Sequence, residues 1–418
     1  MQSWRKLTAL AGAMALLLTG CSAERVPDEV WVGLMEQEIL ERDGVLPANA
    51  PVENSTLPGT EPQTEPEPMT EIPYTDAPAV TEAPAPAATV PDEVSTEDAV
   101  YEVMCSELAQ FHNEMELTGH GVGDAIEPAY DRITWERPDL FWVYGFSSEY
   151  LPTMANVTIT LVEGVPEAQI PAMYEELMQT ARSIASQAEA YPTDYEKILF
   201  VHDYIIDHTQ YDMEGLNTGS YGLWQTAYGC LVQGKAVCEG YADAFLLVMQ
   251  QLGIPCGCVS GDTHEGEPHG WNWVQLNGTY YWLDVTWDDP SAPDSDEQFM
   301  SHKYFLIDDE MLGRSRTVDE LGYFVPQCPS LTDNYYVRSN DYLEGYRFED
   351  IDGRLIMAGD DNTIEVMYSS ADALQAAVSD LFDNEHIWDA TVYHNGGGSY
   401  EYSNDEEMHT LMITYAPD

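Results

Sequence analysis

A two-residue turn in the middle of the chain constrains its fold more than any other feature. Asn277-Gly278 separates two aromatic-rich runs in the segment HGWNWVQLNGTYYWLDVTWDDP, residues 269–290. Asn-Gly between alternating hydrophobic residues is a strong signal for a tight β-hairpin, and such a turn fixes which residues face each other. The expected register pairs Leu276 with Thr279, Trp273 with Trp282 and Trp271 with Asp284.

This register places a histidine beside a carboxylate. His269 lies two residues before Trp271, so it falls on the same face as Asp284 and diagonal to it. Diagonal neighbours have Cα atoms about 7–8 Å apart, which is within hydrogen-bonding reach of these two side chains. The aromatic residues on this face are expected to form core and groove wall: Trp271, Trp273, Tyr280 and Trp282.

Cys238 is expected at the N-terminus of a helix. In KAVCEGYADAFLLVMQQLG, residues 235–253, apolar residues recur at helical spacing after Cys238, and Gly253 supplies a stop. A helix N-terminus and a neighbouring protonated histidine both favour the thiolate, the reactive form of cysteine. Backbone amides at the helix start can also hold an oxyanion. Cys238, His269 and Asp284 therefore have the parts needed for acyl transfer through a thioester.

Three stretches of the chain resemble the transglutaminase-like family: VCEGYA at 237–242, HGWNWV at 269–274 and WLDVTW at 282–287. Residues 196–211 also resemble the leading helix of that family, so the likeness covers about residues 192–307. The resemblance implies an α+β protein with a papain-like core. In that fold the cysteine lies at a helix N-terminus, and the histidine and aspartate lie on an antiparallel sheet.

The resemblance also implies a role for each of the three residues. Cys238 would be the nucleophile, His269 the general base and acid, and Asp284 the residue that orients the imidazole. This chemistry needs no cofactor. No side chain for the oxyanion is implied, and Tyr228 and Gln233 are candidates because they come just before the cysteine.

No metal site is expected from the sequence. Asp288-Asp289 and residues 294–297 offer oxygen ligands for calcium, but they lack the glycine and ligand spacing of an EF-hand loop. We interpret them as a solvated acidic loop, and Asp262 and His264 as solvated residues. The 7 cysteines are irregularly spaced without a CxxC pair, which indicates neither a zinc ribbon nor a disulfide framework.

The N-terminus resembles that of a bacterial lipoprotein precursor. A short basic start is followed by an apolar stretch, residues 7–18, that is too short to span a membrane and is typical of a signal peptide. The sequence LTGC, ending at Cys21, resembles a lipobox. It implies that Cys21 is lipidated and that the mature protein is extracytoplasmic, anchored to the bacterial cell membrane. An ordinary cleaved signal peptide is the alternative.

The chain is strongly acidic, with 74 Asp and Glu against 15 Lys and Arg and a formal net charge of −59. Repulsion disfavours nucleic acid and anionic surfaces as partners, so membrane contact is expected through the lipid anchor only. Cationic peptides or divalent ions are compatible with this charge, and a solubility adaptation is the alternative. The expected partner is a protein or peptide substrate, with cell-wall peptide as one candidate. The oligomeric state is not predicted.

Five segments are expected along the chain: a signal peptide (1–20), a disordered Pro/Thr/Glu-rich tether (21–94), a small α+β region (95–165), a transglutaminase-like core (166–325) and a C-terminal α+β region (330–418). The tether is predicted because residues 47–91 are rich in proline and acid and contain no Lys or Arg.

Periodicity predicts individual elements within these segments. The expected helices begin at Ser95 and run through Met115, begin at Pro171, follow the capping signal Thr193-x-x-Glu196, and cover Ala371–Phe382. The expected strands are Val157–Val162, Arg354–Met357, Thr363–Tyr368, Ala390–His394 and Met408–Tyr415.

Two functions remain open at this point. The first is an extracytoplasmic cysteine-dependent acyltransferase or hydrolase that acts on protein or peptide amides through a thioester at Cys238. The second is a non-catalytic surface module that keeps the fold and uses its aromatic groove to bind peptide or glycan. The reactivity of the Cys238 thiol distinguishes them.

Overall fold

The computed structural model describes residues 88–89, 96–292, 300–319, 324–358, 362–393 and 398–417. The predicted signal peptide, Cys21, nearly all of the predicted tether and the acidic residues 294–297 lie outside the described residues. Among the helices that the structure describes, none combines the length and the apolar character needed to cross a bilayer.

The first folded region pairs two helices with a small sheet. Helices α3 (Thr96–Leu108) and α4 (Val122–Glu136) pack together beside a sheet of order β1-β2-β4-β3, in which β1 is Ala88–Thr89, β2 is Glu114–Thr118, β3 is Val143–Leu151 and β4 is Met154–Leu161. The predicted strand at 157–162 is thus found in β4. The prediction that the first helix runs through Met115 is wrong, because the chain turns at Phe111 (φ 63°) and Met115 lies in β2.

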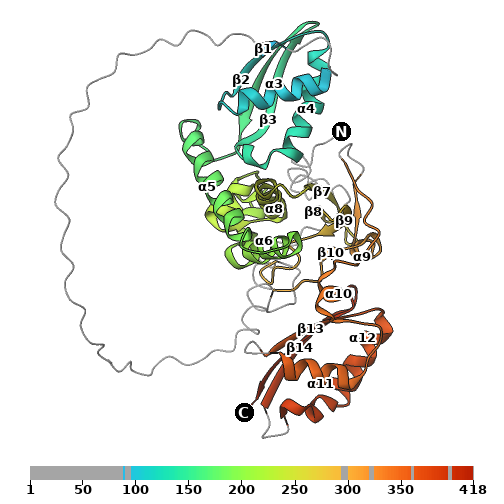
Figure 1. Ribbon diagram of the computed structural model, residues 1–418. Helices are drawn as coiled ribbons and strands as arrows, with labels where there is room; N and C mark the ends of the chain where they lie inside the picture. The colour runs from blue at the N-terminus through green and yellow to red at the C-terminus, as the bar shows by residue number, and fades with distance from the viewer. Residues whose placement is uncertain are drawn as a thin grey trace, which may run out of the picture. The chain divides into compact units, whose positions relative to one another are not determined.

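The central region places helices against an antiparallel sheet (Figure 1). The helices are α5 (Ile170–Ala188), α6 (Asp194–His208) and α8 (Cys238–Leu252). The sheet has the order β10-β9-β8-β7-β11, with β7 at Cys256–Thr263, β8 at Pro268–Leu276, β9 at Thr279–Leu283, β10 at Phe305–Ile307 and β11 at Arg316–Val318. Helix α8 contacts α5, α6, β7 and β8, so it occupies the middle of this region.

Local sequence signals explain the ends of the two helices that matter most. At the start of α6, Thr193 and Glu196 form the predicted capping box, in which each side chain pairs with the backbone of the other. Helix α8 begins at Cys238 as predicted, and it ends at Gly253, which has a left-handed φ of 70°. Residues 239–249 of α8 are all buried, as expected for a helix enclosed on every side.

The hairpin has the predicted register for two of the three expected pairs, while the third, Trp271 with Asp284, lies beyond the end of β9 at Leu283. Trp273 pairs with Trp282 and Leu276 pairs with Thr279 across the Asn277-Gly278 turn. Asn277 and Gly278 both have positive φ values, 53° and 83°, as this kind of two-residue turn requires. Because the register is fixed at the turn, the faces of all residues in β8 and β9 follow from it.

The last folded region has a four-stranded sheet of order β12-β13-β15-β14 with helices beside it. The strands are β12 (Tyr342–Leu343), β13 (Thr363–Tyr368), β14 (Gly398–Asp405) and β15 (Thr410–Pro417), and the main helices are α11 (Phe348–Met357) and α12 (Ala371–Val378). The predicted α+β class is confirmed.

Two predicted strands of this last region are wrong. Residues 354–357 form the end of helix α11, because the apolar run is too short to show its period and the helix starts six residues earlier. Residues 391–393 form a short 3-10 helix. The predicted strands at 363–368 and 408–415 are found as β13 and β15, and the predicted helix begins at Ala371.

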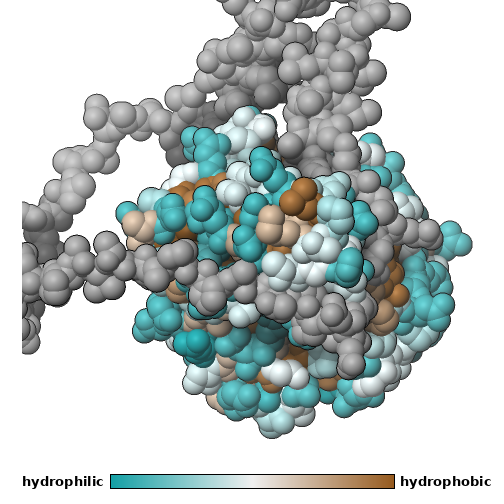
Figure 2. All heavy atoms as spheres, turned by 90° about the horizontal axis from the view of Figure 1, so that it is seen from above, coloured by the Kyte–Doolittle hydropathy of each residue, from teal (hydrophilic) through white to brown (hydrophobic). Residues whose placement is uncertain are grey.

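The surface reflects the acidic composition. On the face seen in Figure 2, hydrophilic residues predominate and hydrophobic ones form small patches between them. The large apolar side chains are instead gathered in the interior, where Trp271, Trp282, Tyr241 and Phe245 are fully buried.

A glycine in the first turn of α8 gives a direct test of this packing. A Cβ at Gly240 would lie 2.8 Å from the carbonyl oxygen of Trp224 and 3.0 Å from that of Thr226. We expect Gly240→Ala to lower the free energy of unfolding by about 1–3 kcal/mol, the usual range for overpacking. Urea denaturation followed by circular dichroism measures the change.

Gly353→Ala is the matched control. Gly353 also lies inside a helix, α11, but its added Cβ would have no heavy atom within 4 Å. Alanine should therefore stabilise the protein there by about 0.4–1 kcal/mol. Equal effects of the two substitutions would contradict the close approach at Gly240.

Candidate active site

Cys238 lies at the first position of helix α8, with Val237 as the N-cap residue. The first backbone hydrogen bond of the helix runs from the amide of Tyr241 to the carbonyl of Val237 (3.1 Å). The amides of residues 238–240 precede that bond, so they are the orphan donors of the helix N-terminus. Cys238 is half-buried and its thiol is free. A partly accessible sulfur therefore lies beside backbone donors and the positive end of the helix dipole.

His269 lies in β8 and bridges Cys238 and Asp284. Its Nε2 atom lies 2.7 Å from Oδ2 of Asp284, and both side chains are buried. Cys238 also lies close enough to His269 to contribute to the raised pKa of the imidazole. Since Nε2 is engaged by the carboxylate, Nδ1 is the ring nitrogen left for the thiol. The structure thus brings together the three residues that the sequence selected.

The electrostatics of the pair favour a charged imidazole. Burial opposes the imidazolium, but Asp284 and Cys238 outweigh it and raise the pKa of His269 to about 9. Burial likewise opposes the carboxylate of Asp284, yet His269 and Arg316 hold the pKa of Asp284 well below its usual range. At neutral pH this places an imidazolium between an aspartate and a cysteine.

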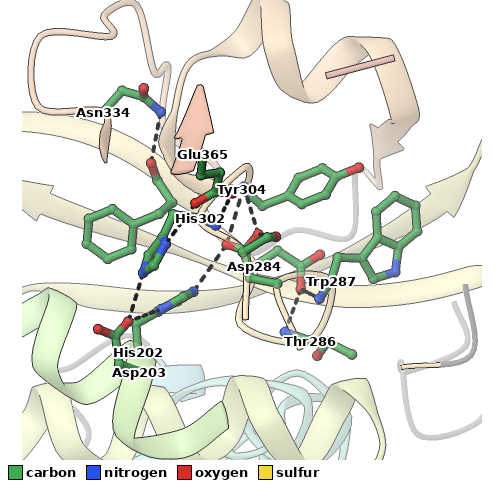
Figure 3. Close-up of polar contacts among 12 residues, drawn as sticks. His202, Asp203, Asp284, Thr286, Trp287, His302, Tyr304, Asn334 and Glu365 are labelled. Carbon is green, nitrogen blue, oxygen red and sulfur yellow. Dashed lines mark hydrogen bonds and ion pairs between the residues drawn. The ribbon is translucent and has the colours of Figure 1, made fainter. Parts of the chain in front are cut away.

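Asp284 is held by more than its histidine, as Figure 3 shows in part. Its Oδ1 atom accepts hydrogen bonds from the backbone amides of Thr286 (3.0 Å) and Trp287 (3.2 Å), and its backbone amide donates to the carbonyl of Tyr304 (3.3 Å). The side-chain oxygens are therefore divided: Oδ1 fixes the carboxylate in place and Oδ2 faces His269. This division explains how the imidazole keeps one orientation.

Arg316 is a member of the site that the sequence analysis missed. It lies in β11, is buried, and its Nη1 atom pairs with Oδ2 of Asp284. Its guanidinium also lies over the ring of Trp287, 3.8 Å from the centroid, and over Tyr304 at 4.6 Å. No local pattern distinguishes Arg316 from its neighbour Arg314, which pairs with Glu310 near the surface. Only the three-dimensional pairing identifies it.

A glycine lets the strand that carries Arg316 approach the sheet. Gly261 in β7 pairs with His269 on one side and with Val318 of β11 on the other. A Cβ at Gly261 would lie 1.8 Å from the carbonyl oxygen of Thr317. Any side chain there would push β11 away from the sheet and with it the guanidinium that meets Asp284.

Aromatic rings enclose the imidazole. The ring of His269 lies 5.9 Å from that of Trp271 and 5.2 Å from that of Trp287. Trp271 and Trp282 are buried as expected, while Trp273 and Tyr280 are partly buried and contact each other at the edge of the core. The apolar walls lower the local polarity around His269, which strengthens its charge interactions.

The two side chains that the sequence suggested as oxyanion donors, Tyr228 and Gln233, have other surroundings. The hydroxyl of Tyr228 donates to Glu176 (2.8 Å), so its proton is directed away from the thiol. Gln233 is exposed and lines a surface pocket together with His208 and Thr209. The backbone amides of residues 238–240 are the donors that the geometry provides.

The acidic residues after Asp284 require a correction. Asp262 and His264 are exposed, as predicted, but Asp288 and Asp289 are buried rather than solvated. Asp288 lies 3.1 Å from Nε2 of His202, and Asp289 accepts a hydrogen bond from Tyr241 (2.5 Å). Their partners come from α6 and α8, far away in sequence. The sequence around Asp288 and Asp289 alone therefore gives no sign of these partners.

Burial raises the pKa values of the five thiols other than Cys238 that the structure describes. The six cysteines that the structure describes are all free. Burial raises the pKa of Cys230 to about 12 and raises those of Cys256, Cys258 and Cys328 as well. Buried thiols of this kind do not reach the thiolate at neutral pH.

The central region matches a known family. Residues 180–287, about a quarter of the chain, match the family model described as the transglutaminase-like superfamily. These residues contain α6, α8, the hairpin and all three of Cys238, His269 and Asp284. The chain therefore contains a transglutaminase-like domain, with the papain-type α+β fold that the sequence predicted.

Individual relatives share only part of their length with the chain. Kyphoscoliosis peptidase of Mus musculus is 27% identical over 106 residues, which covers 23% of this chain and 16% of that protein. The Homo sapiens protein of the same name is 23% identical over 171 residues, covering 37% of this chain and 26% of the relative. The chain thus spans about a quarter or less of the curated relatives it matches.

Solved structures show a comparable partial likeness. One described as a TGase has 16% sequence identity and a TM-score of 0.27, covering 46% of this chain and 55% of that one. The periplasmic domain of TgpA from Pseudomonas aeruginosa has 16% identity and a TM-score of 0.23, covering 34% of this chain and 56% of that one.

The ion pair of Arg316 with Asp284 gives a test of the site's architecture. Arg316→Met should lower the free energy of unfolding by about 3–5 kcal/mol, because it leaves a buried carboxylate without one of its two charged partners. Asp284 has a depressed pKa, so its stabilising contribution is present above pH about 4 and is lost as the pH falls further. The deficit of the variant, measured by urea denaturation, should therefore shrink in acid.

Arg338→Met is the control for this substitution. Arg338 also pairs with a carboxylate, Asp333, and also lies over a ring, that of Tyr195. Its side chain is 41% exposed, however, so its loss should cost no more than about 1 kcal/mol. A similar loss of unfolding free energy in both variants would show that burial of the ion pair between Arg316 and Asp284 does not increase its contribution to stability.

Proposed function

We propose that the protein is a cysteine-dependent amide acyltransferase or hydrolase that acts on protein or peptide amides through a thioester at Cys238. The observation that carries the proposal is the position of His269. Its imidazole interacts with the Cys238 thiol and, through Nε2, with Asp284 at 2.7 Å, and it is charged below a pKa of about 9. A thiol at a helix N-terminus beside an imidazolium is the arrangement that activates cysteine as a nucleophile.

In the first half of the reaction, the sulfur of Cys238 attacks the carbonyl carbon of the amide and a C–S bond forms. The charge that develops on the carbonyl oxygen faces the orphan amides at the start of α8. His269 then donates its proton to the amide nitrogen as the C–N bond breaks, and the amine leaves. Asp284 keeps the imidazolium oriented and charged until that transfer.

In the second half, water or an amine attacks the thioester. His269, now neutral, takes the proton of the acceptor, and the C–S bond breaks to restore the thiolate of Cys238 beside the imidazolium. Hydrolysis and amine transfer use the same three residues and differ only in which acceptor reaches the thioester. The names of the relatives, a peptidase on one side and a TGase on the other, are compatible with both outcomes.

The setting we propose is the outer face of a bacterial cell membrane, with Cys21 lipidated and residues 21–94 as the tether. The sequence LTGC at residues 18–21 and the apolar stretch before it support this proposal. A peptide substrate at that location, with cell-wall peptide as one candidate, is consistent with a net charge of −59 that repels nucleic acid.

The three residues should behave as one unit when they are changed. Cys238→Ala, His269→Ala and Asp284→Asn should each lower turnover of a peptide amide by orders of magnitude, and a second change should add almost nothing. The substrate is first found by screening peptide amides with wild type against Cys238→Ala. Iodoacetamide should label Cys238 faster than a free thiol at pH 6, and this advantage should fade above pH about 9, where His269 loses its proton.

His264→Ala is the control, because His264 is an exposed histidine just before β8 that is outside the site. It should leave labelling and turnover unchanged. Near-normal turnover by Asp284→Asn on a substrate that Cys238→Ala cannot process would refute the role of Asp284. Ordinary thiol behaviour of Cys238 together with no turnover would favour the alternative, a module that binds peptide or glycan without catalysis.

Membrane attachment is tested separately. Cys21→Ser should release the protein from the membrane fraction of an expressing bacterium, because the lipidated cysteine is the proposed anchor. Fractionation followed by immunoblotting measures the distribution, with Cys105→Ser as the matched control that should stay with the membrane. Retention of the Cys21→Ser protein in the membrane would contradict lipid anchoring at that residue.

A further inference from the structure

A second cluster of chemically active side chains lies next to the triad and takes no part in its chemistry (Figure 3). His202 and Asp203 are consecutive residues of helix α6, and His302 lies three residues before β10. Oδ1 of Asp203 lies 2.8 Å from Nδ1 of His202 and 3.2 Å from Nε2 of His302. One atom from each of the three residues lies within 4.8 Å of the others.

Each histidine of this cluster has a carboxylate on its other ring nitrogen. Nε2 of His202 lies 3.1 Å from Oδ2 of Asp288, and Nδ1 of His302 lies 3.4 Å from Oε2 of Glu365. A neutral imidazole has one N–H donor and one lone pair. With the outer nitrogen of each ring directed at its carboxylate, the inner nitrogens of both rings face the same carboxylate oxygen of Asp203. Each of these inner contacts between nitrogen and oxygen needs either a proton or a metal ion between the two atoms.

The two outer carboxylates are themselves fixed. Asp288 accepts hydrogen bonds from Ser301 Oγ (2.8 Å) and from the amide of Tyr304 (3.1 Å). Glu365 accepts from the hydroxyl of Tyr336 (2.6 Å). Carboxylates that hold the outer N–H of metal-binding histidines in this way orient the ring and select the tautomer. The cluster thus has an inner set of three ligand atoms and an outer set of supporting groups.

The spacing suits a small tetrahedral ion. Ligand atoms that lie 2.0–2.1 Å from a tetrahedral Zn²⁺ are about 3.3 Å from one another. The separations of 2.8 and 3.2 Å around Oδ1 of Asp203 need only a small outward movement of the side chains to reach that value. His302 is held by stacking on Tyr335 (3.9 Å between centroids) and His202 by the edge of Phe305, so neither ring is free to turn away.

The chemistry of the ligand atoms selects the kind of ion. Two imidazole nitrogens and one carboxylate oxygen favour zinc and its neighbours in the transition series over calcium and magnesium, which prefer oxygen ligands only. His202 is fully buried, but the side chain of Asp203 is 36% exposed, so an ion can enter from the solvent on that side. Three protein ligands leave the fourth position to water.

We propose that Nδ1 of His202, Oδ1 of Asp203 and Nε2 of His302 bind a divalent transition metal, with Zn²⁺ as the best fit. The ion replaces the N–H···O hydrogen bonds between the imidazoles and Asp203 and releases the protons that they hold. It fastens helix α6 to the segment between β9 and β10, the segment that carries both Asp284 and Asp288. This site departs from the sequence expectation of no metal, and its role is to hold that segment in place rather than to take part in catalysis.

The test is a zinc titration of the full-length chain. The protein is first treated with iodoacetamide, so that Cys238 cannot bind metal, and is then stripped with a chelator. Zn²⁺ is added in competition with a chromophoric chelator in the presence of excess Mg²⁺, which occupies simple carboxylate sites. We expect one tightly bound equivalent, and Zn²⁺ should raise the thermal midpoint because it binds only the folded state. Co²⁺ in its place should give the visible spectrum of tetrahedral coordination.

Two variants and one control locate the ion. Asp203→Asn removes an inner ligand and should weaken Zn²⁺ by about 100-fold or more, while Glu365→Gln leaves all three ligands and should weaken it by about 10–100-fold. Asp380→Asn is the control: Asp380 lies 2.7 Å from Nδ1 of His386, another histidine–carboxylate pair, in which both side chains are about one-third exposed. The affinity of the Asp380→Asn protein for Zn²⁺ should stay within twofold of that of wild type.

The remaining outcomes overturn the proposal. Absence of a tight equivalent in wild type would mean that the cluster is a hydrogen-bonded network that shares protons. An unchanged affinity in Asp203→Asn and Glu365→Gln would place the ion elsewhere on the acidic surface. If Asp203→Asn fails to fold by circular dichroism, the comparison of Glu365→Gln with Asp380→Asn decides the question, since neither residue is a ligand.

Discussion

The candidate site depends on one buried carboxylate. Asp284 is removed from water, and a buried charge is tolerated only when it is paired and hydrogen-bonded. Two backbone amides, those of Thr286 and Trp287, meet one oxygen, while His269 and Arg316 meet the other. Because the four donors come from three parts of the chain, the carboxylate can be satisfied only when the hairpin, the loop after it and β11 are all in place. The formation of the site and the folding of this region are thus the same event.

The acidic composition determines which cations can serve as partners inside the protein. Among the buried side chains that the structure describes, seven are Asp or Glu, and only two, Lys303 and Arg316, are permanent cations. Three histidines pair with carboxylates in the interior: His202, His269 and His302. Each has a ring nitrogen that lies within 3.4 Å of a carboxylate oxygen. At His269 the result is an imidazolium that can activate a thiol. At the other two it is a pair of rings whose inner nitrogens face one carboxylate oxygen, Oδ1 of Asp203.

The features that the sequence predicted are local ones. The capping box at Thr193, the stop at Gly253 and the hairpin register at Asn277-Gly278 each depend on residues within a few positions, and so their signals survive without knowledge of the fold. The register alone was enough to bring His269 to Asp284. The stretch at 354–357 failed for the opposite reason, since four residues are too few to distinguish a strand from the last turn of a helix.

The features that the sequence did not predict are pairings between distant segments. Arg316 is 32 residues from Asp284, and His302 is 99 residues from Asp203, with no periodicity that relates either pair. The resulting contacts nevertheless meet in one stretch, since Asp284 and Asp288 are four residues apart. Tyr304 contacts both of them through its backbone: its carbonyl accepts from the amide of Asp284 and its amide donates to Asp288. A displacement of Asp288 would therefore move the backbone of Tyr304, whose carbonyl accepts from the amide of Asp284. The proposed metal site and the triad are thus connected through the backbone of this one residue.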